Sequence, residues 1–165
     1  MQEQVLQQLA RDTGRLLLSR GLRLVTAESC TGGWIAKVMT DIPGSSQWFE
    51  RGFVTYTNEA KMELLEVERE LFERHGAVSL PVAMEMATGA LRHSRADVAV
   101  SVSGIAGPGG GSRTKPVGTV CFGWALGTHF RRVDRRHFPG DREAVRRQAV
   151  IRALKGVGEL LGRRA

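Results

Sequence analysis

The chain has 165 residues, of which 42% are hydrophobic and 25% are charged, and its formal net charge is +7. This composition is that of an ordinary globular domain, and it excludes a disordered chain, a collagen and a disulfide scaffold. No apolar run reaches the ~20 residues that span a bilayer, residues 1–20 lack the apolar core of an export signal, and two cysteines are too few for a disulfide framework. We therefore expect one cytoplasmic domain over residues 1–165, with two free thiols and no membrane contact.

The first half of the chain alternates predicted helices and strands. Apolar residues recur at helical spacing over residues 3–20, and residues 22–27 form a short predicted strand. A polar turn at 28–33 then leads into a helix through 34–39. After a loop at 41–46, residues 51–57 form a second predicted strand, and Asn58 is the predicted N-cap of the helix that carries Lys61.

The second half contains three predicted strands between two helices. A helix is expected over 81–95, with a proline in its first turn. Valines alternate with small residues over 97–103, which is typical of a strand. After the Gly-rich loop 104–112 come an alternating strand at 118–126, a charged strand at 129–138 expected at a sheet edge, and a terminal helix over 141–161.

This alternation of elements indicates an α/β sandwich with a largely parallel sheet. The connection between 118–126 and 129–138 is too short for a crossover, so that pair is predicted to be antiparallel and the sheet mixed. Ligands of open α/β sheets bind outside the carboxyl ends of parallel strands. Polar or Gly-rich segments follow three of the predicted strands, at 28–33, 56–61 and 103–112. If those strands are parallel neighbours, the three segments meet in one site.

The first of these segments places a serine at a strand–turn–helix junction. Ser29 would face the crevice, and the backbone N–H groups from Cys30 to Gly33 could hold an anion or a developing oxyanion at the start of the helix. Alternatively, Ser29 or Thr31 is only an N-cap. Cys30 is the rival nucleophile, because a helix N-terminus lowers the pKa of a thiol. However, no histidine follows a strand where it could pair with that thiol.

A serine nucleophile needs a base, and the second segment offers Lys61 and Tyr56. A neutral lysine can accept the proton if burial lowers its pKa from ~10.4 toward ~7. The alternative is that Lys61 is an ordinary solvated residue on a helix face. One observation favours the first hypothesis. The chain has 20 arginines and only four lysines, and arginine cannot act as a base.

Two further features leave function open. The loop 104–112 has no Walker A sequence; it is either an anion-binding loop with Arg113 and Lys115 beside it, or a mobile surface loop. Residues 129–165 hold 11 basic and 4 acidic side chains, whereas residues 1–128 hold 13 of each. Such a cluster fits a nucleic-acid partner or merely a solvated, Arg-rich surface. No aromatic residues interleave it as in a groove for single strands.

Several segments resemble the CinA C-terminal domain family. They are Thr-Ala-Glu-Ser-Cys-Thr-Gly-Gly at 26–33, Gly-Phe-Val-Thr-Tyr-Thr-Asn-Glu-Ala-Lys at 52–61, Ser-Gly-Ile-Ala-Gly-Pro at 103–108, Lys-Pro-Val-Gly-Thr-Val at 115–120 and Gly-Asp-Arg-Glu-Ala-Val-Arg at 140–146. The resemblance runs from about residue 5 to 160, and it is greatest to the stand-alone bacterial form of the family. It implies a three-layer α/β/α sandwich with a mixed, mostly parallel five-stranded sheet.

The resemblance also implies an activity, an amidohydrolase that converts nicotinamide mononucleotide to nicotinate mononucleotide and ammonia in pyridine nucleotide salvage. It assigns Ser29 as the nucleophile, Lys61 as the base and Tyr56 as a nearby participant. The matched substrate-binding positions are Cys30, Thr31, Gly32, Gly33, Ser103, Gly104, Gly107 and Arg142. No metal or organic cofactor is implied, and a homo-oligomer is expected. Gly109 departs from the family, whose members often have an acidic residue there.

Two alternatives belong to other functional classes. One is a competence- or DNA-damage-associated domain in which the Ser–Lys pair is catalytically silent. The other is a nucleic-acid-binding module that uses the basic segment 129–165; nucleic acid is the less favoured partner, and a small-molecule substrate the favoured one.

Overall fold

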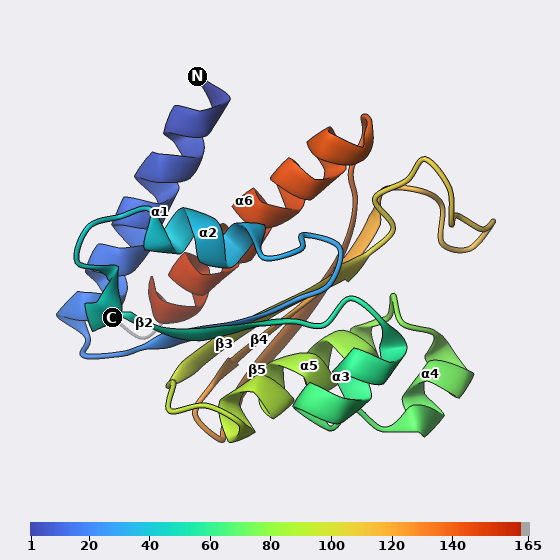
Figure 1. Cartoon of the computed structure of the whole chain (residues 1–165), viewed down its shortest axis with the longest axis horizontal. Helices are drawn as coiled ribbons and strands as arrows, with labels where there is room; N and C mark the ends of the chain where they lie inside the picture. The colour runs from blue at the N-terminus through green and yellow to red at the C-terminus, as the bar shows by residue number, and fades with distance from the viewer. Residues whose placement is uncertain (163–165) are drawn as a thin grey trace.

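The computed structural model describes residues 1–162, and a five-stranded sheet lies between two layers of helices (Figure 1). The strands are β1 (Leu24–Glu28), β2 (Phe49–Val54), β3 (Val98–Gly104), β4 (Thr119–Leu126) and β5 (Phe130–His137), in the order β2-β1-β3-β4-β5. β1 pairs with β2 and β3 in parallel, and β4 pairs with β3 and β5 antiparallel. Only β4 therefore runs against the others. The predicted mixed, mostly parallel sheet is confirmed, as is the antiparallel hairpin at one edge.

The helices divide between the two faces of the sheet (Figure 1). One layer holds α1 (Gln2–Ser19), α2 (Trp34–Thr40) and α6 (Arg142–Gly162), and the other holds α3 (Asn58–Leu65), α4 (Arg69–His75) and α5 (Leu80–Arg92). A short 3-10 turn, η1, spans Ser45–Gln47. None of the helices within residues 1–162 combines the length and the apolar character needed to cross a membrane.

Three local predictions were wrong or incomplete. Helix α4 was not predicted, because none of its seven residues is fully buried and its two apolar residues, Leu71 and Phe72, are adjacent and show no helical periodicity. Thr57, rather than Asn58, is the N-cap of α3, since its hydroxyl accepts the N–H of Ala60 at 3.0 Å. Strand β2 ends at Val54, before the predicted end at residue 57. The three residues after it are therefore free to turn toward β1.

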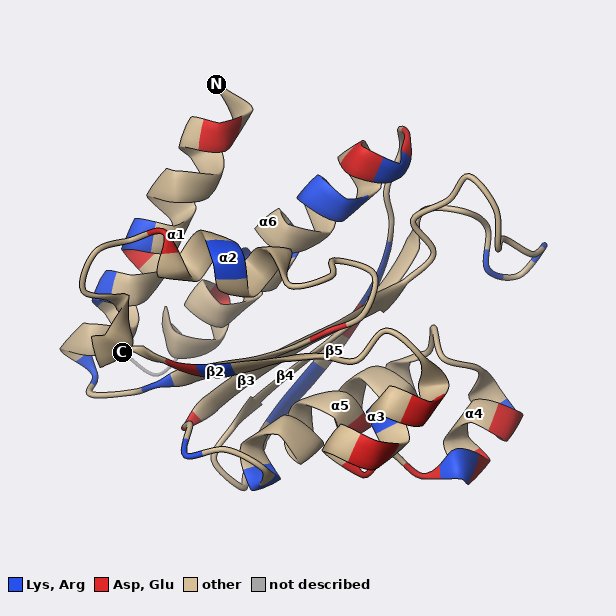
Figure 2. Ribbon diagram, viewed as in Figure 1, with Lys and Arg blue, Asp and Glu red and all other residues tan. Residues whose placement is uncertain are grey.

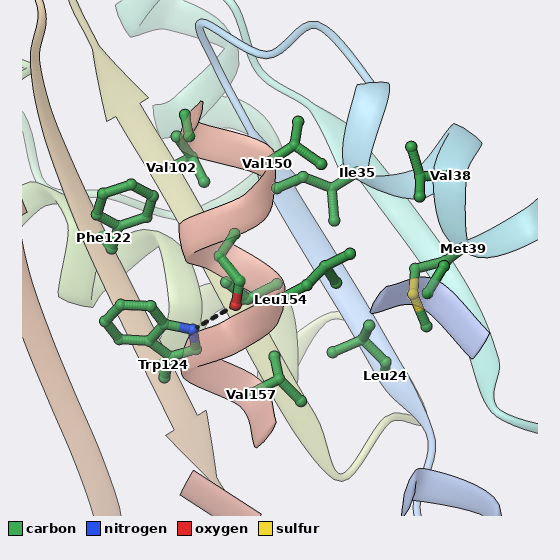
Figure 3. Close-up of a cluster of buried hydrophobic side chains, with 14 of the residues drawn as sticks. Leu24, Ile35, Val38, Met39, Val102, Phe122, Trp124, Val150, Leu154 and Val157 are labelled. Carbon is green, nitrogen blue, oxygen red and sulfur yellow. Dashed lines mark hydrogen bonds between the residues drawn. The ribbon is translucent and has the colours of Figure 1, made fainter. Parts of the chain in front are cut away.

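The larger part of the core lies between the sheet and the layer of α1, α2 and α6. Figure 3 shows Trp124 of β4 lying against α6, where its indole N–H donates to the carbonyl of Ala153 at 3.0 Å. This close approach depends on Gly156, where a Cβ would lie 2.1 Å from Cζ2 of Trp124. The contact fixes α6 on the sheet and so positions the first turn of α6 above the carboxyl ends of the parallel strands.

The three parallel strands end side by side. Glu28, the last residue of β1, is in register with Val54, the last residue of β2, and with Val102 near the end of β3. The segments that follow these strands therefore emerge at one edge of the sheet, as expected from the sequence. This edge is the place to look for a functional site.

Candidate active site

Ser29 and Lys61 meet at the carboxyl end of the sheet. Ser29 follows β1 directly, and its backbone N–H donates to the carbonyl of Val102 on β3 at 3.0 Å. Lys61 lies in the first turn of α3. The Nζ of Lys61 is 3.0 Å from the Oγ of Ser29. The serine is 7% exposed and the lysine only 1%, so the amine is held inside the protein rather than on a solvated helix face.

Backbone carbonyls surround the amine of Lys61. Its Nζ donates to the carbonyl oxygens of Thr55 at 2.9 Å, Tyr56 at 3.2 Å and Thr57 at 3.5 Å. Within the described residues, no carboxylate forms an ion pair with it. Burial therefore lowers the pKa of Lys61 to about 8. At pH 7 about one amine in ten is then neutral, whereas a solvated lysine would be almost entirely charged.

The hydrogen bond between Ser29 and Lys61 changes direction with the protonation state of the amine. A neutral amine has two N–H donors and one lone pair. The two nearest carbonyls, of Thr55 and Tyr56, can take both donors, which leaves the lone pair for the hydroxyl proton of Ser29. When the amine is charged, it donates to Ser29 instead, and the hydroxyl can turn to the carbonyl of Tyr56 at 3.4 Å. The neutral form is thus arranged as a base for Ser29.

The turn after Ser29 is held from within by Glu28. This carboxylate is fully buried and accepts hydrogen bonds from the hydroxyl of Thr31 at 2.6 Å and from the N–H groups of Ile35 and Ala36, both at 2.9 Å. Burial raises the pKa of Glu28, and these hydrogen bonds oppose the increase. The first N–H groups of α2 are therefore occupied by the protein's own acid.

This arrangement limits which amides could form the expected anion site after Ser29, and that site stays a prediction. Helix α2 begins only at Trp34, and the N–H of Gly32 is used within the turn, where it donates to the carbonyl of Ser29 at 3.0 Å. The amide of Cys30 belongs to the residue directly after Ser29, where a donor would lie beside an oxyanion that forms at that hydroxyl.

Cys30 is buried and is a free thiol. Burial raises its pKa to about 12, and the nearby Glu28 charge contributes further. The thiol is therefore protonated at neutral pH, and it lacks the thiolate character of a catalytic cysteine. A Cβ at Gly104 would lie 3.1 Å from the Sγ of Cys30, so this glycine allows β3 to pass the turn closely.

The backbone carbonyl and the phenol of Tyr56 contact different parts of the site. Its carbonyl faces Lys61 and Ser29, whereas its phenol oxygen accepts a hydrogen bond from Nη2 of Arg142 at 2.9 Å, and the residue as a whole is 57% exposed. Nη1 of Arg142 donates to the carbonyl of Gly107 at 2.8 Å. Arg142 therefore connects the segment after β2 with the loop after β3, at the border of the site.

Ser103 lies at the end of β3, but its hydroxyl donates to the carbonyl of Ala77 at 2.8 Å. The structure therefore directs this hydroxyl to the segment before α5 rather than to the Ser29–Lys61 pair.

Three residues in contact with this site were not predicted from the sequence. Glu28 gave a readable signal, because it is a carboxylate at the end of an otherwise uncharged strand and three residues before a threonine. Thr55 gave none, since it acts through its carbonyl. Arg146 of α6 donates from Nε to the carbonyl of Cys30 at 3.0 Å and from Nη2 to that of Thr31 at 3.2 Å; its distance of more than a hundred residues along the chain hides this contact.

Part of the basic segment is paired with acidic side chains nearby, although its 11 basic and 4 acidic residues leave a net positive charge. Figure 2 shows Lys and Arg on β5 and α6, with acidic residues concentrated on α3 and α4. Arg152 pairs with Asp134 and Glu159, Arg132 with Glu159, and Arg136 with Asp134. Residues 163–165 of the segment lie outside the described residues. Across residues 1–162, no cluster of three His, Cys, Asp or Glu side chains could hold a metal ion.

Comparison with known proteins gives one consistent family. The model of the CinA C-terminal domain matches residues 6–161. The nicotinamide-nucleotide amidohydrolase PncC of Escherichia coli is 58% identical over 155 residues, which cover 94% of each chain. A CinA-like protein of Akkermansia muciniphila is 52% identical over 141 residues, which cover 86% of this chain but 34% of that protein. The same kind of domain therefore also occurs within longer chains.

A solved structure agrees with these sequence matches. The crystal structure of the competence/damage inducible protein CihA from Agrobacterium tumefaciens superposes with a TM-score of 0.92 at 44% identity, covering 94% of this chain and 95% of that one. The three-layer architecture is thus that of a solved relative.

Proposed function

This chain belongs to the CinA C-terminal domain family, and on that premise we propose that it is an amidohydrolase of nicotinamide mononucleotide, with Ser29 as nucleophile and Lys61 as base. The substrate follows from the name of the Escherichia coli relative, which is similar over nearly its whole length. The products would be nicotinate mononucleotide and ammonia.

One observation carries the catalytic assignment, the 3.0 Å contact between the Ser29 hydroxyl and a buried amine that has no acidic partner within the described residues. A structural lysine in the interior is normally paired with a carboxylate. Here the partners of Lys61 are carbonyls and a hydroxyl, which suit a neutral amine that takes up and returns a proton.

The proposed reaction has two halves. The Oγ of Ser29 attacks the carboxamide carbon while its proton passes to the Nζ of Lys61. The oxyanion of the tetrahedral intermediate lies against the amide of Cys30. The C–N bond breaks as Lys61 returns the proton to the leaving amino group, which departs as ammonia. Water then attacks the acyl-enzyme, with Lys61 again as the base, and releases the nicotinate product and the Ser29 hydroxyl.

The remaining site residues border the substrate in this proposal. The turn from Cys30 to Gly33 and the segment of Gly104 and Gly107 form the walls around the carboxamide. Arg142, at the exposed start of α6, is the cation assigned to the phosphate or the carboxamide. Tyr56 assists through its carbonyl at Lys61 and through the hydrogen bond of its phenol with Arg142.

The decisive experiment is ammonia release from nicotinamide mononucleotide by the purified protein. Ser29→Ala is expected to lower kcat by at least ~10³-fold, because it removes the only group that forms the acyl bond. Ser19→Ala, a change of the same chemistry on the exposed end of α1, should leave the rate unchanged. Wild-type ammonia release by Ser29→Ala would overturn the assignment, and no release by the wild type would favour a catalytically silent domain.

The location, the oligomeric state and the alternative of nucleic-acid binding belong to the same proposal. Both cysteines are free, which fits the reducing cytoplasm that we propose as its location. A homo-oligomer stays a prediction, which the molar mass in solution would test.

Gel-shift titration with duplex DNA over a range of salt concentrations tests the alternative of nucleic-acid binding. If the protein binds DNA through its basic segment, the affinity should fall steeply as the salt concentration rises.

A further inference from the structure

Arg146 connects α6 to the turn that carries the nucleophile. Its guanidinium donates to two successive carbonyls of that turn, those of Cys30 and Thr31. It lies directly against the turn, since a Cβ at Gly32 would be 3.3 Å from its Nη2. A planar guanidinium that holds two neighbouring acceptors fixes both peptide planes, which a single point charge cannot do.

The two hydrogen bonds of Arg146 also affect the orientation of the backbone N–H of Cys30, the residue after Ser29. A peptide unit is planar, so fixing the carbonyl of Thr31 also fixes the N–H of Gly32. That N–H donates to the carbonyl of Ser29 at 3.0 Å. The carbonyl of Ser29 shares its peptide plane with the N–H of Cys30, the amide assigned to the oxyanion. The carbonyl of Thr31 also accepts the N–H of Trp34 at 3.0 Å, so Arg146 is one of two donors that set the orientation of this amide.

The guanidinium is itself held in place. Its Cζ lies 5.6 Å from the ring centroid of Trp34, the first residue of α2, so a cation–π contact supports it from the other end of the turn. Arg142 and Arg146 are four residues apart and share one face of α6. From this face, Arg142 reaches the segments after β2 and β3, and Arg146 reaches the turn after β1.

We propose that Arg146 is a positioning residue of the amidase reaction, which orients the backbone of the Ser29–Gly32 turn so that the nucleophile and the Cys30 amide face the same substrate carbon. This inference rests on the proposed function. Arg146 acts through the turn, because its Nε and Nη2 donate to the carbonyls of Cys30 and Thr31.

The chain contains a matched control for this role. Arg147 stacks on the same Trp34, with its Cζ 5.2 Å from the ring centroid. Its hydrogen bonds, however, go to Gln2 at 3.1 Å and Glu143 at 3.0 Å rather than to the turn. Removing Arg147 therefore removes a similar charge and a similar ring contact, but leaves the backbone of the turn held.

The test compares Arg146→Ala, Arg146→Lys and Arg147→Ala with the wild type. We expect Arg146→Ala to lower kcat by about 10- to 100-fold, the loss typical of a displaced catalytic group, with KM within about threefold because no substrate contact is removed. Arg146→Lys keeps the charge but holds one carbonyl at a time, so its kcat should lie between the kcat of Arg146→Ala and that of the wild type. Arg147→Ala should keep the wild-type kcat. Far-ultraviolet circular dichroism and thermal melting show that each variant is folded.

A second measurement tests the positioning role of Arg146 without depending on the proposed substrate. Covalent labelling of Ser29 by a small fluorophosphonate, followed by mass spectrometry, reports the turn without any nucleotide. Slower labelling of Arg146→Ala than of Arg147→Ala supports the positioning role, even if the wild type releases no ammonia and the proposed substrate is wrong. Equal labelling and equal kcat in the folded Arg146→Ala variant would overturn it, as would a change confined to KM.

Discussion

Replacing Lys61 by methionine tests the buried amine through stability as well as through activity. Methionine has a similar length and no charge, so it fills the same space beside Ser29. In the wild type, burial lowers the pKa of Lys61 from 10.5 to about 8. At about 1.4 kcal/mol for each pKa unit, this decrease corresponds to at most about 3.5 kcal/mol.

The sign of the effect follows from proton binding. Between about pH 8 and pH 10.5 the lysine is protonated in the unfolded chain and neutral in the folded one, so the unfolded state binds more protons. The free energy of unfolding of the wild type should therefore rise with pH over this range by up to about 3.5 kcal/mol. Below pH 8 the penalty of the buried ammonium is present in full.

The measurement is denaturant unfolding of both proteins across this pH range. Other titrating groups are common to the two, so they cancel in the difference between their free energies of unfolding. Lys61→Met also leaves the carbonyls of Thr55 and Tyr56 without their donor, which lowers its stability by a nearly constant amount. A difference that stays flat from pH 8 to 10.5 would refute the lowered pKa, and wild-type ammonia release by the variant would refute the base.

Other expected outcomes follow from the same geometry. The wild-type kcat/KM should increase about tenfold for each pH unit below 8 and level off above it, as Lys61 loses its proton; a pH-independent rate would exclude this base. Cys30→Ala should retain activity within a few fold, since a thiol with a pKa of about 12 supplies no thiolate; loss of acyl-enzyme formation in this variant would argue for the cysteine. Gly156→Ala should destabilise the fold by several kcal/mol, because its Cβ meets the Trp124 ring, whereas Gly158→Ala, with open space around it, should stabilise α6 by up to ~1 kcal/mol; equal thermal midpoints would contradict this packing.

Much of the fold could be predicted because its signals are local. Alternating valines identified β3, the short connection identified the β4–β5 hairpin, and helical periodicity identified α1 and α6. Helix α4 was not predicted because it is short and its two partly buried residues, Leu71 and Phe72, are adjacent and form no periodic pattern. The N-cap of α3 was assigned one residue late, since Thr57 and Asn58 have the same capping chemistry and only the backbone geometry selects between them.

The candidate site was predictable as a set of segments but not as a set of contacts. Parallel strands bring their carboxyl ends together, so Ser29 and the segment of Lys61 were expected at one edge. The contact of the Tyr56 carbonyl with Lys61, and the direction of the Ser103 hydroxyl toward Ala77, depend on rotamers and backbone directions that residue types do not encode.

The sequence by itself determined which groups are available: a serine at a strand end, one lysine thirty-two residues later, and the periodicities that make a three-layer sandwich. Only the tertiary structure decided the state of that lysine. The pKa of an amine depends on solvent and charge within a few ångströms, and here that environment is made of carbonyls after β2 and a hydroxyl after β1. Likewise, only packing of α6 brings Arg146 onto a turn more than a hundred residues away, because contact is a property of the folded chain and not of neighbours in sequence.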